Sequence, residues 1–177
     1  MAEDGLKVDF QQVFDRLDGL AEVAKQHLPR SMAVATGQVF RDEAKARAPR
    51  GEAAPTSKVG PRLPLAESIY LAYSENRSAP DAGIATYSVT WNSKRAPHGH
   101  LVEFGHWQPY RVFRDKDGNW RTDKSSPLPS PKWISAKPFL RPAYDAMGQT
   151  AIAAGLNRGR ERMNEILANP AILDQYK

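Results

Sequence analysis

The sequence predicts an α+β domain in which a long N-terminal helix, a group of short strands and a C-terminal helix follow one another along 177 residues. Two observations lead to this order. Apolar residues recur at three- and four-residue steps near both ends of the chain, and in the middle they alternate with polar residues. Strands that are grouped together, rather than interleaved with helices, favour α+β over a parallel sheet. The length suits a single domain, residues 1–177.

The N-terminal part, residues 1–47, is expected to form a helix from about Val8 to Ala46. Pro29 lacks an N–H and clashes with the preceding turn, so the helix either kinks there or gives way to a second helix. An apolar stripe supports the prediction, and it comprises Phe10, Val13, Phe14, Leu17, Leu20, Ala24 and Leu28, then Met32, Ala35, Val39, Phe40 and Ala44. Its first half serves either the core or a contact with another subunit.

The middle of the chain is predicted to contain strands between two proline-rich loops. The first loop covers residues 48–64 and the second, rich in proline and serine, covers residues 123–137. We expect the second loop to be extended but outside any ladder, because proline has no N–H to donate. The sheet region, 65–122, holds strands at 69–73 and 85–91, a strand or helical turn at 101–104, and strands at 110–113 and 120–122 around a hairpin tip at 115–119.

The C-terminal helix is expected over residues 138–169, with Pro142 tolerated in its first turn. Four small residues share one face of this helix, namely Gly148, Ala151, Gly155 and Gly159. Each mid-helix glycine costs roughly 1 kcal/mol relative to alanine. Either another backbone approaches this face closely, from the sheet or from a neighbouring subunit, or the helix is broken.

No motif in the chain carries recognisable chemistry, so an enzyme is disfavoured and neither catalytic nor cofactor-binding residues are predicted. There is no glycine-rich phosphate loop, no nucleophile elbow and no cysteine. No apolar run approaches eighteen residues, which argues against a membrane span. The net charge of +5 is dispersed, and it serves either solubility or contact with nucleic acid or an acidic protein surface.

Three histidines and a glutamate occur together as His98, His100, Glu103 and His106. Imidazoles in turns can bind zinc, and a metal-dependent hydrolase using the three histidines is therefore an alternative. However, the spacing suits no single face of a helix or strand. We interpret the histidines as loop residues beside an interface, and predict no metal site.

Two stretches carry a resemblance to a known family. Val102–Gly105 is V-E-F-G and Pro138–Ala143 is P-F-L-R-P-A, and a third stretch, Leu65–Ile69, fits L-x-x-S-I. Together they resemble the small neck and tail-completion proteins of long-tailed bacteriophages, over roughly residues 30–150. The chain departs from that pattern at His106, where threonine is usual, and in the proline–serine insertion.

The resemblance implies an α+β fold with a kink near Pro29, an antiparallel sheet of about four strands and a C-terminal helix packed on the sheet. It also implies a non-catalytic virion protein, assembled in the bacterial cytoplasm, that forms a head–tail connector. Its expected partners are further copies in a homo-oligomeric ring of six or twelve, neighbouring head-completion, adaptor or portal proteins, and tail proteins. Genomic DNA would pass through the ring without specific binding. A basic nucleic-acid-binding protein is the other alternative.

The two motifs and the small-residue face supply the interface candidates. These are Glu103, Phe104, Gly105, Trp107, Trp133, Phe139, Leu140, Arg141, Gly148 and Gly155. Phe104 is expected in the core, Gly105 in a conformation that other residues resist, and Glu103 against a neighbour or a backbone N–H. Arg141 would bridge to Glu103 of the next copy. Loops 48–64 and 122–137 are expected to contact partners.

Overall fold

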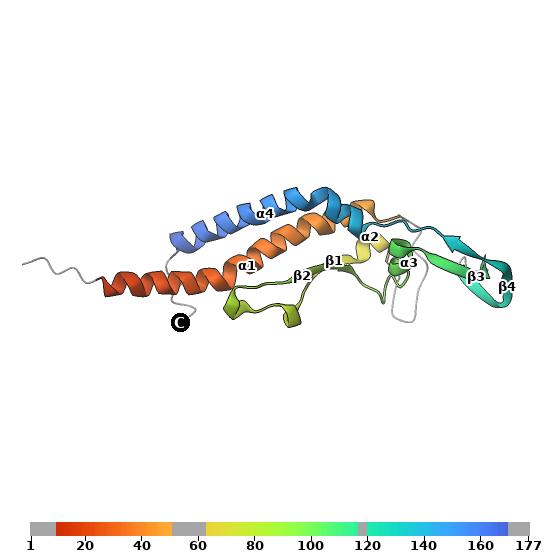
Figure 1. The fold of residues 1–177 in the computed structure, drawn as a ribbon, viewed down its shortest axis with the longest axis horizontal. Helices are drawn as coiled ribbons and strands as arrows, with labels where there is room; N and C mark the ends of the chain where they lie inside the picture. The colour runs from red at the N-terminus through yellow and green to blue at the C-terminus, as the bar shows by residue number, and fades with distance from the viewer. Residues whose placement is uncertain (1–9, 51–62, 117–119, 170–177) are drawn as a thin grey trace, which may run out of the picture.

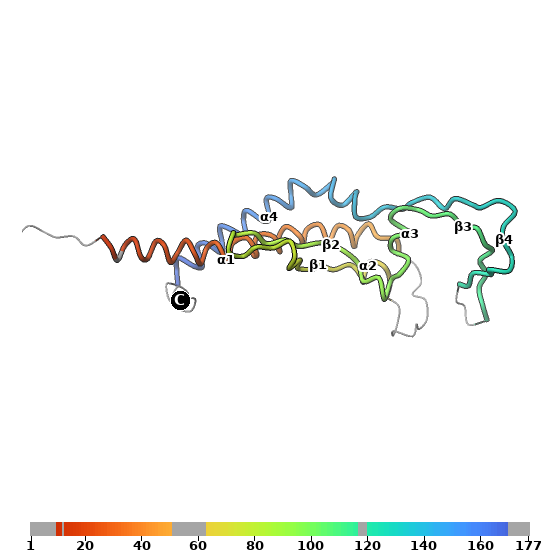
Figure 2. The backbone as a smooth tube through the Cα atoms, turned by 60° about the horizontal axis from the view of Figure 1, so that its bottom comes forward, coloured from red at the N-terminus to blue at the C-terminus, as the bar shows by residue number. Residues whose placement is uncertain are grey.

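The molecule is elongated, with a layered body and an extension at each end (Figures 1 and 2). The computed structural model describes residues 10–50, 63–116 and 120–169. Most of the predicted loop 48–64 and part of the hairpin tip at 115–119 lie outside the described residues. The α+β class and the order of helix, strands and helix are confirmed.

Two long helices form most of the body. α1 runs from Gln11 to Arg47 as one helix that contains Pro29, and Figure 1 shows its axis bending part-way along. α4 runs from Leu140 to Ala168. α1 contacts α4 on one side and the first two strands on another, so it lies between them. The C-terminal helix therefore packs chiefly on the N-terminal helix, and not on a sheet as expected.

The small residues of α4 explain this packing. Ala151, Gly155 and Gly159 are buried against α1. A Cβ atom at Gly159 would lie 2.9 Å from the sulfur of Met32, and one at Gly155 would lie 3.3 Å from the carbonyl oxygen of Met32. The helix is unbroken, and the backbone that approaches its glycines is the chain's own. At Gly148, by contrast, nothing lies within 4 Å of an added Cβ.

The four strands form two separate antiparallel pairs instead of one sheet. The first pair, β1 (Ile69–Tyr73) and β2 (Tyr87–Trp91), follows the short helix α2 (Leu65–Ser68), and the 3₁₀ turns η1 (Glu75–Arg77) and η2 (Pro80–Ala82) connect the two strands. The second pair is β3 (His106–Arg114) and β4 (Trp120–Ile134). Between the pairs, residues Gly99–Phe104 form helix α3, so the helical alternative for this stretch is confirmed.

The proline–serine segment is extended as predicted, but the expectation that it stays outside any ladder is wrong. It belongs to β4, where Pro127 lies opposite Tyr110 of β3. The register shifts on both sides of Tyr110, and such irregularities leave residues whose N–H is not needed by the ladder. Proline is tolerated there for that reason. The irregularity also agrees with the bend of the β3–β4 pair in Figure 2.

The buried core lies where the C-terminal end of α1, the start of β1 and the start of α4 meet. Its members are Ala44, Ala48, Leu65, Ile69, Ala96, Phe139 and Ala143. The ring of Trp91 meets that of Phe139 edge-on, with centroids 6.1 Å apart. This core fixes the start of α4 relative to α3 and β3, on which the candidate site depends.

Candidate functional site

The two motifs of the sequence meet in space through one buried carboxylate. Glu103, at the end of α3, is 7% exposed. One of its oxygens, Oε2, accepts hydrogen bonds from the backbone N–H groups of Phe139 (2.8 Å) and Leu140 (3.1 Å), and Oε1 accepts one from Arg141 (3.2 Å). The expectation that Glu103 faces a backbone N–H is confirmed. The carboxylate binds its own chain, so the bridge proposed from Arg141 to Glu103 of the next copy is wrong.

These bonds account for the N-terminus of α4 completely. The first four N–H groups of a helix have no partner within it, and here they belong to residues 139–142. Three donate to Glu103 and the fourth is absent, because Pro142 has no N–H. A carboxylate at this end also interacts favourably with the helix dipole. The V-E-F-G and P-F-L-R-P-A motifs are therefore the two halves of one helix cap.

Gly105 brings the two halves close together. Its φ of +74° and ψ of 173° lie in a region that is essentially restricted to glycine, which confirms the expected conformation. A Cβ atom here would lie 2.8 Å from the carbonyl oxygen of Ile134 and 2.9 Å from the backbone nitrogen of Ala136. The N–H of Lys137 also donates to the carbonyl oxygen of Val102, at 2.8 Å.

The burial of the two phenylalanines in the motifs is the reverse of what was expected. Phe139, an interface candidate, is fully buried, whereas Phe104, expected in the core, is 72% exposed. Since α3 is a helix, Phe104 follows Glu103 by 100° around the axis and points away from the buried carboxylate. Leu140 is half-buried and Arg141 is exposed.

Exposed tryptophans lie beside Phe104 in the sequence and at the base of the β3–β4 pair. Trp107 and Trp133 are directly opposite each other in the two strands, and their rings meet edge-on with centroids 5.3 Å apart. Trp107 is 62% exposed and Trp133 is also exposed. Large exposed aromatic side chains of this kind are enriched at protein interfaces. Both tryptophans remain interface candidates.

The β3–β4 pair, which we call the arm, projects from the body (Figures 1 and 2). Its two strands pack mainly on each other. Three apolar side chains towards its tip are exposed, namely Val112, Phe113 and Trp120. The guanidinium of Arg114 lies 5.2 Å from the centre of the Trp120 ring. An isolated two-stranded hairpin is marginally stable in water, so the arm is suited to a partner's surface.

The opposite end of the molecule carries the N-terminal part of α1, residues 10–24, whose first turns project beyond α4 (Figure 1), although Val23 is buried. The first four residues of the predicted stripe are exposed here, with Phe10, Val13, Phe14 and Leu17 each more than half exposed. The rest of its first half, Leu20, Ala24 and Leu28, is half-buried. Only the first four residues therefore remain candidates for a subunit contact. On the same segment, Asp15, Asp18 and Glu22 recur at steps of three and four, a spacing that sequence inspection could have identified.

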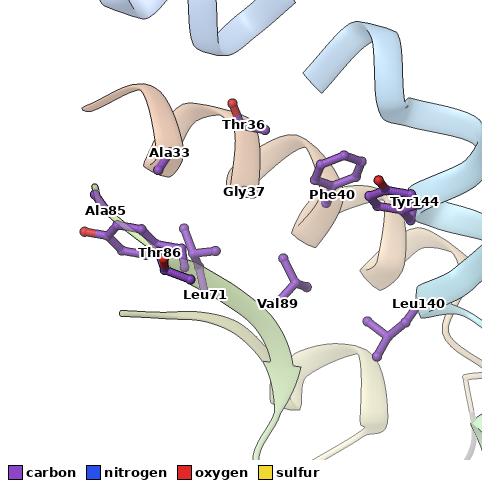
Figure 3. A pocket seen from close by; sticks show the side chains of 11 residues that line it. Ala33, Thr36, Gly37, Phe40, Leu71, Ala85, Thr86, Val89, Leu140 and Tyr144 are labelled. Atoms are coloured by element: carbon purple, nitrogen blue, oxygen red, sulfur yellow. The ribbon is translucent and has the colours of Figure 1, made fainter. Parts of the chain in front are cut away.

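An apolar groove of about 530 Å³ lies between α1, the β1–β2 pair and the start of α4 (Figure 3). Phe40 and Tyr144 stack at one end, with ring centroids 5.3 Å apart, and Leu71 and Val89 project from the strands. Tyr144 is exposed. The lining offers few polar groups, so the groove is suited to apolar contact and not to chemistry.

The histidines do not form a metal site. His98 precedes α3, His100 lies on it with an exposed side chain, and His106 begins β3. In the part of the chain that the structure describes, no three histidine, aspartate or glutamate side chains come together to hold a metal ion. Both oxygens of Glu103 are occupied by backbone N–H groups. None of the described helices is long and apolar enough to cross a membrane.

Comparison with known proteins gives one finding. The family described as "Bacteriophage HK97-gp10, putative tail-component" matches residues 11–105. The matched segment covers more than half of the chain and includes α1, the β1–β2 pair, and α3 with Glu103 and Gly105. Comparison with curated proteins and with solved structures gave no match.

Proposed function

Since the chain belongs to the HK97-gp10-like family of bacteriophage tail components, we propose that it is a ring-forming subunit of the neck, or tail-completion complex, that joins the head to the tail. Family membership makes it a structural protein of the phage virion, consistent with a non-enzymatic role. The position at the neck, the ring and the joining of portal-side to tail proteins are the proposed part.

The observation that carries the proposal is the exposure of large apolar side chains on two extensions that do not pack on the chain's own core. The projecting part of α1 exposes Phe10 and Phe14, and the arm exposes Phe113 and Trp120. Exposed aromatic side chains are enriched at protein interfaces, so such surfaces are typical of subunits that become covered on assembly. The segments that enter and leave the arm meet at Gly105, where an added Cβ atom would lie 2.8 Å from the carbonyl oxygen of Ile134.

The two extensions differ from each other in structure, one being a helix and the other a strand pair. Contacts between unlike surfaces are heterologous, and they form a ring where the repeated rotation closes on itself. A ring that surrounds the path of the genome would join two cylindrical structures, the portal and the tail, without catalysis. Genomic DNA would pass through its centre with no sequence-specific contact.

The experiment is to place a stop codon early in the coding sequence of the phage and to image the lysate by electron microscopy. We expect DNA-filled heads and complete tails that are separate, with joining restored when the wild-type protein is supplied from a plasmid. Joined but non-infectious particles would contradict the neck position, and an absence of tails would place the protein in the tail tube. A stop codon in a known tail-tube gene provides the control.

A further inference from the structure

We propose that the arm of one copy docks on the N-terminal part of α1 of the next copy, residues 10–24, through apolar contact and opposite charge. The inference rests on the proposed ring and names the two surfaces that would form it. Both surfaces are described above by their exposed apolar side chains. Charge decides which surface pairs with which.

The helical surface is acidic. Residues 10–24 contain three carboxylates, Asp15, Asp18 and Glu22, and one basic residue, Arg16, for a net charge of −2. On a helix the three acids lie in one row along a flank of the stripe formed by Phe10, Val13, Phe14 and Leu17. Glu22 pairs with Lys25, just beyond this segment, at 3.7 Å, whereas Asp15 and Asp18 are like charges three residues apart and repel each other. A basic partner would relieve this repulsion while covering the stripe.

The arm is basic. Residues 106–134 contain six lysines and arginines against three aspartates, for a net charge of +3. All six basic side chains are exposed. Asp115 and Asp123 are more enclosed, since Asp115 pairs with Arg121 at 2.8 Å and Asp123 accepts hydrogen bonds from Ser125. The accessible charge of the arm is thus positive. Basic and apolar side chains occur together on both of its faces, since Arg114 shares one face with Val112 and Trp120, and Arg111 and Arg121 share the other with Phe113.

The two surfaces cannot meet within one chain. They lie at opposite ends of the molecule (Figure 1), with the body between them. α1 is one continuous helix, so its N-terminal part cannot fold back towards the arm. A contact between them therefore needs a second copy. Because each copy carries both surfaces, its arm can bind α1 of one neighbour while its own α1 binds the arm of another.

Charge reversal tests the pairing. An arm variant carries Lys116→Glu and Lys124→Glu, and a helix variant carries Asp15→Lys and Asp18→Lys. All four side chains are exposed. Opposing like charges across an interface weakens association strongly, so we expect each variant alone to associate at least about tenfold more weakly than the wild type in analytical ultracentrifugation. Circular dichroism should show an unchanged melting temperature.

Mixing the two variants gives the decisive result. In the arm variant both surfaces are acidic, and in the helix variant both are basic, so each repels itself but attracts the other. An equimolar mixture should recover wild-type association, with the two variants alternating. The charge-matched control, Lys94→Glu with Arg95→Glu, lies in an exposed turn and should associate like the wild type.

Several outcomes would overturn the inference. If the wild type forms rings and neither variant weakens them, or if mixing does not restore association, the arm does not bind α1, although the proposed ring stands. If the helix variant associates more weakly than the wild type but the arm variant does not, α1 pairs with α1 of the next copy and not with the arm. If the arm variant associates normally but loses affinity for duplex DNA in fluorescence anisotropy, the arm serves nucleic acid. A wild type that stays monomeric at high concentration would refute the ring itself.

Discussion

Replacing Glu103 with alanine should destabilise the protein more than any other single loss of a charge, because three N–H groups of α4 would lose their acceptor. Hydrogen bonds to a charged group contribute about 1.5–3 kcal/mol each when well buried. Phe139 is fully buried, so we take this full value for its bond. Leu140 and Arg141 lie nearer solvent, and we take about 1 kcal/mol for each of their bonds. The expected loss is therefore about 3.5–5 kcal/mol.

Urea unfolding followed by circular dichroism would measure this loss. For a chain of this size it corresponds to a fall of about 7–20 °C in melting temperature. Glu103→Gln keeps one acceptor oxygen and should lose about half as much. Glu75→Gln, at an exposed site, provides the matched control and should be within about 0.5 kcal/mol of the wild type. A free energy of unfolding for Glu103→Ala within about 1 kcal/mol of the wild type would refute the helix-cap argument.

Two further predictions concern backbone conformation and pH. Gly105→Ala should lower the free energy of unfolding by about 2–5 kcal/mol, because φ is positive at this position and the backbone of Ile134 is close. At Gly148 an added Cβ atom meets nothing, so Gly148→Ala should be neutral or stabilise α4 by up to about 1 kcal/mol. Equal effects of the two substitutions in urea unfolding would count against this explanation. Burial lowers the pKa of His27 below its usual 6.5, with help from Arg162 and Arg30, so the unfolded chain takes up a proton that the folded chain resists. The free energy of unfolding should therefore fall as the pH drops from about 7.5 through 6.5 to about 5.5. His27→Gln should make the melting temperature depend less on pH over this range. If the melting temperature of His27→Gln changes with pH as steeply as that of the wild type, other groups cause the dependence.

Periodicity and local chemistry determined the elements of this protein. The apolar stripe identified α1, the alternation from Tyr87 to Trp91 identified β2, and Pro142 marked the start of α4. The motif around Gly105 predicted its backbone conformation, because a glycine after a short apolar run is the residue that permits a positive φ. These features depend on neighbours within a few residues, and the sequence displays them directly.

Partners distant in the sequence were decided only by the tertiary structure. From the sequence alone, Glu103 could face solvent, a neighbouring subunit or a backbone N–H group. The fold places its carboxylate against the backbone N–H of Phe139 at the start of α4, 36 residues away. The small face of α4 could have packed on a sheet or another subunit, and it packs on α1 because Gly155 and Gly159 allow a close helix pair. Spacing shows which residues share a face, but what that face contacts depends on how the whole chain is arranged. The exposure of Phe14 on α1 and of Trp120 on the arm follows from the same arrangement.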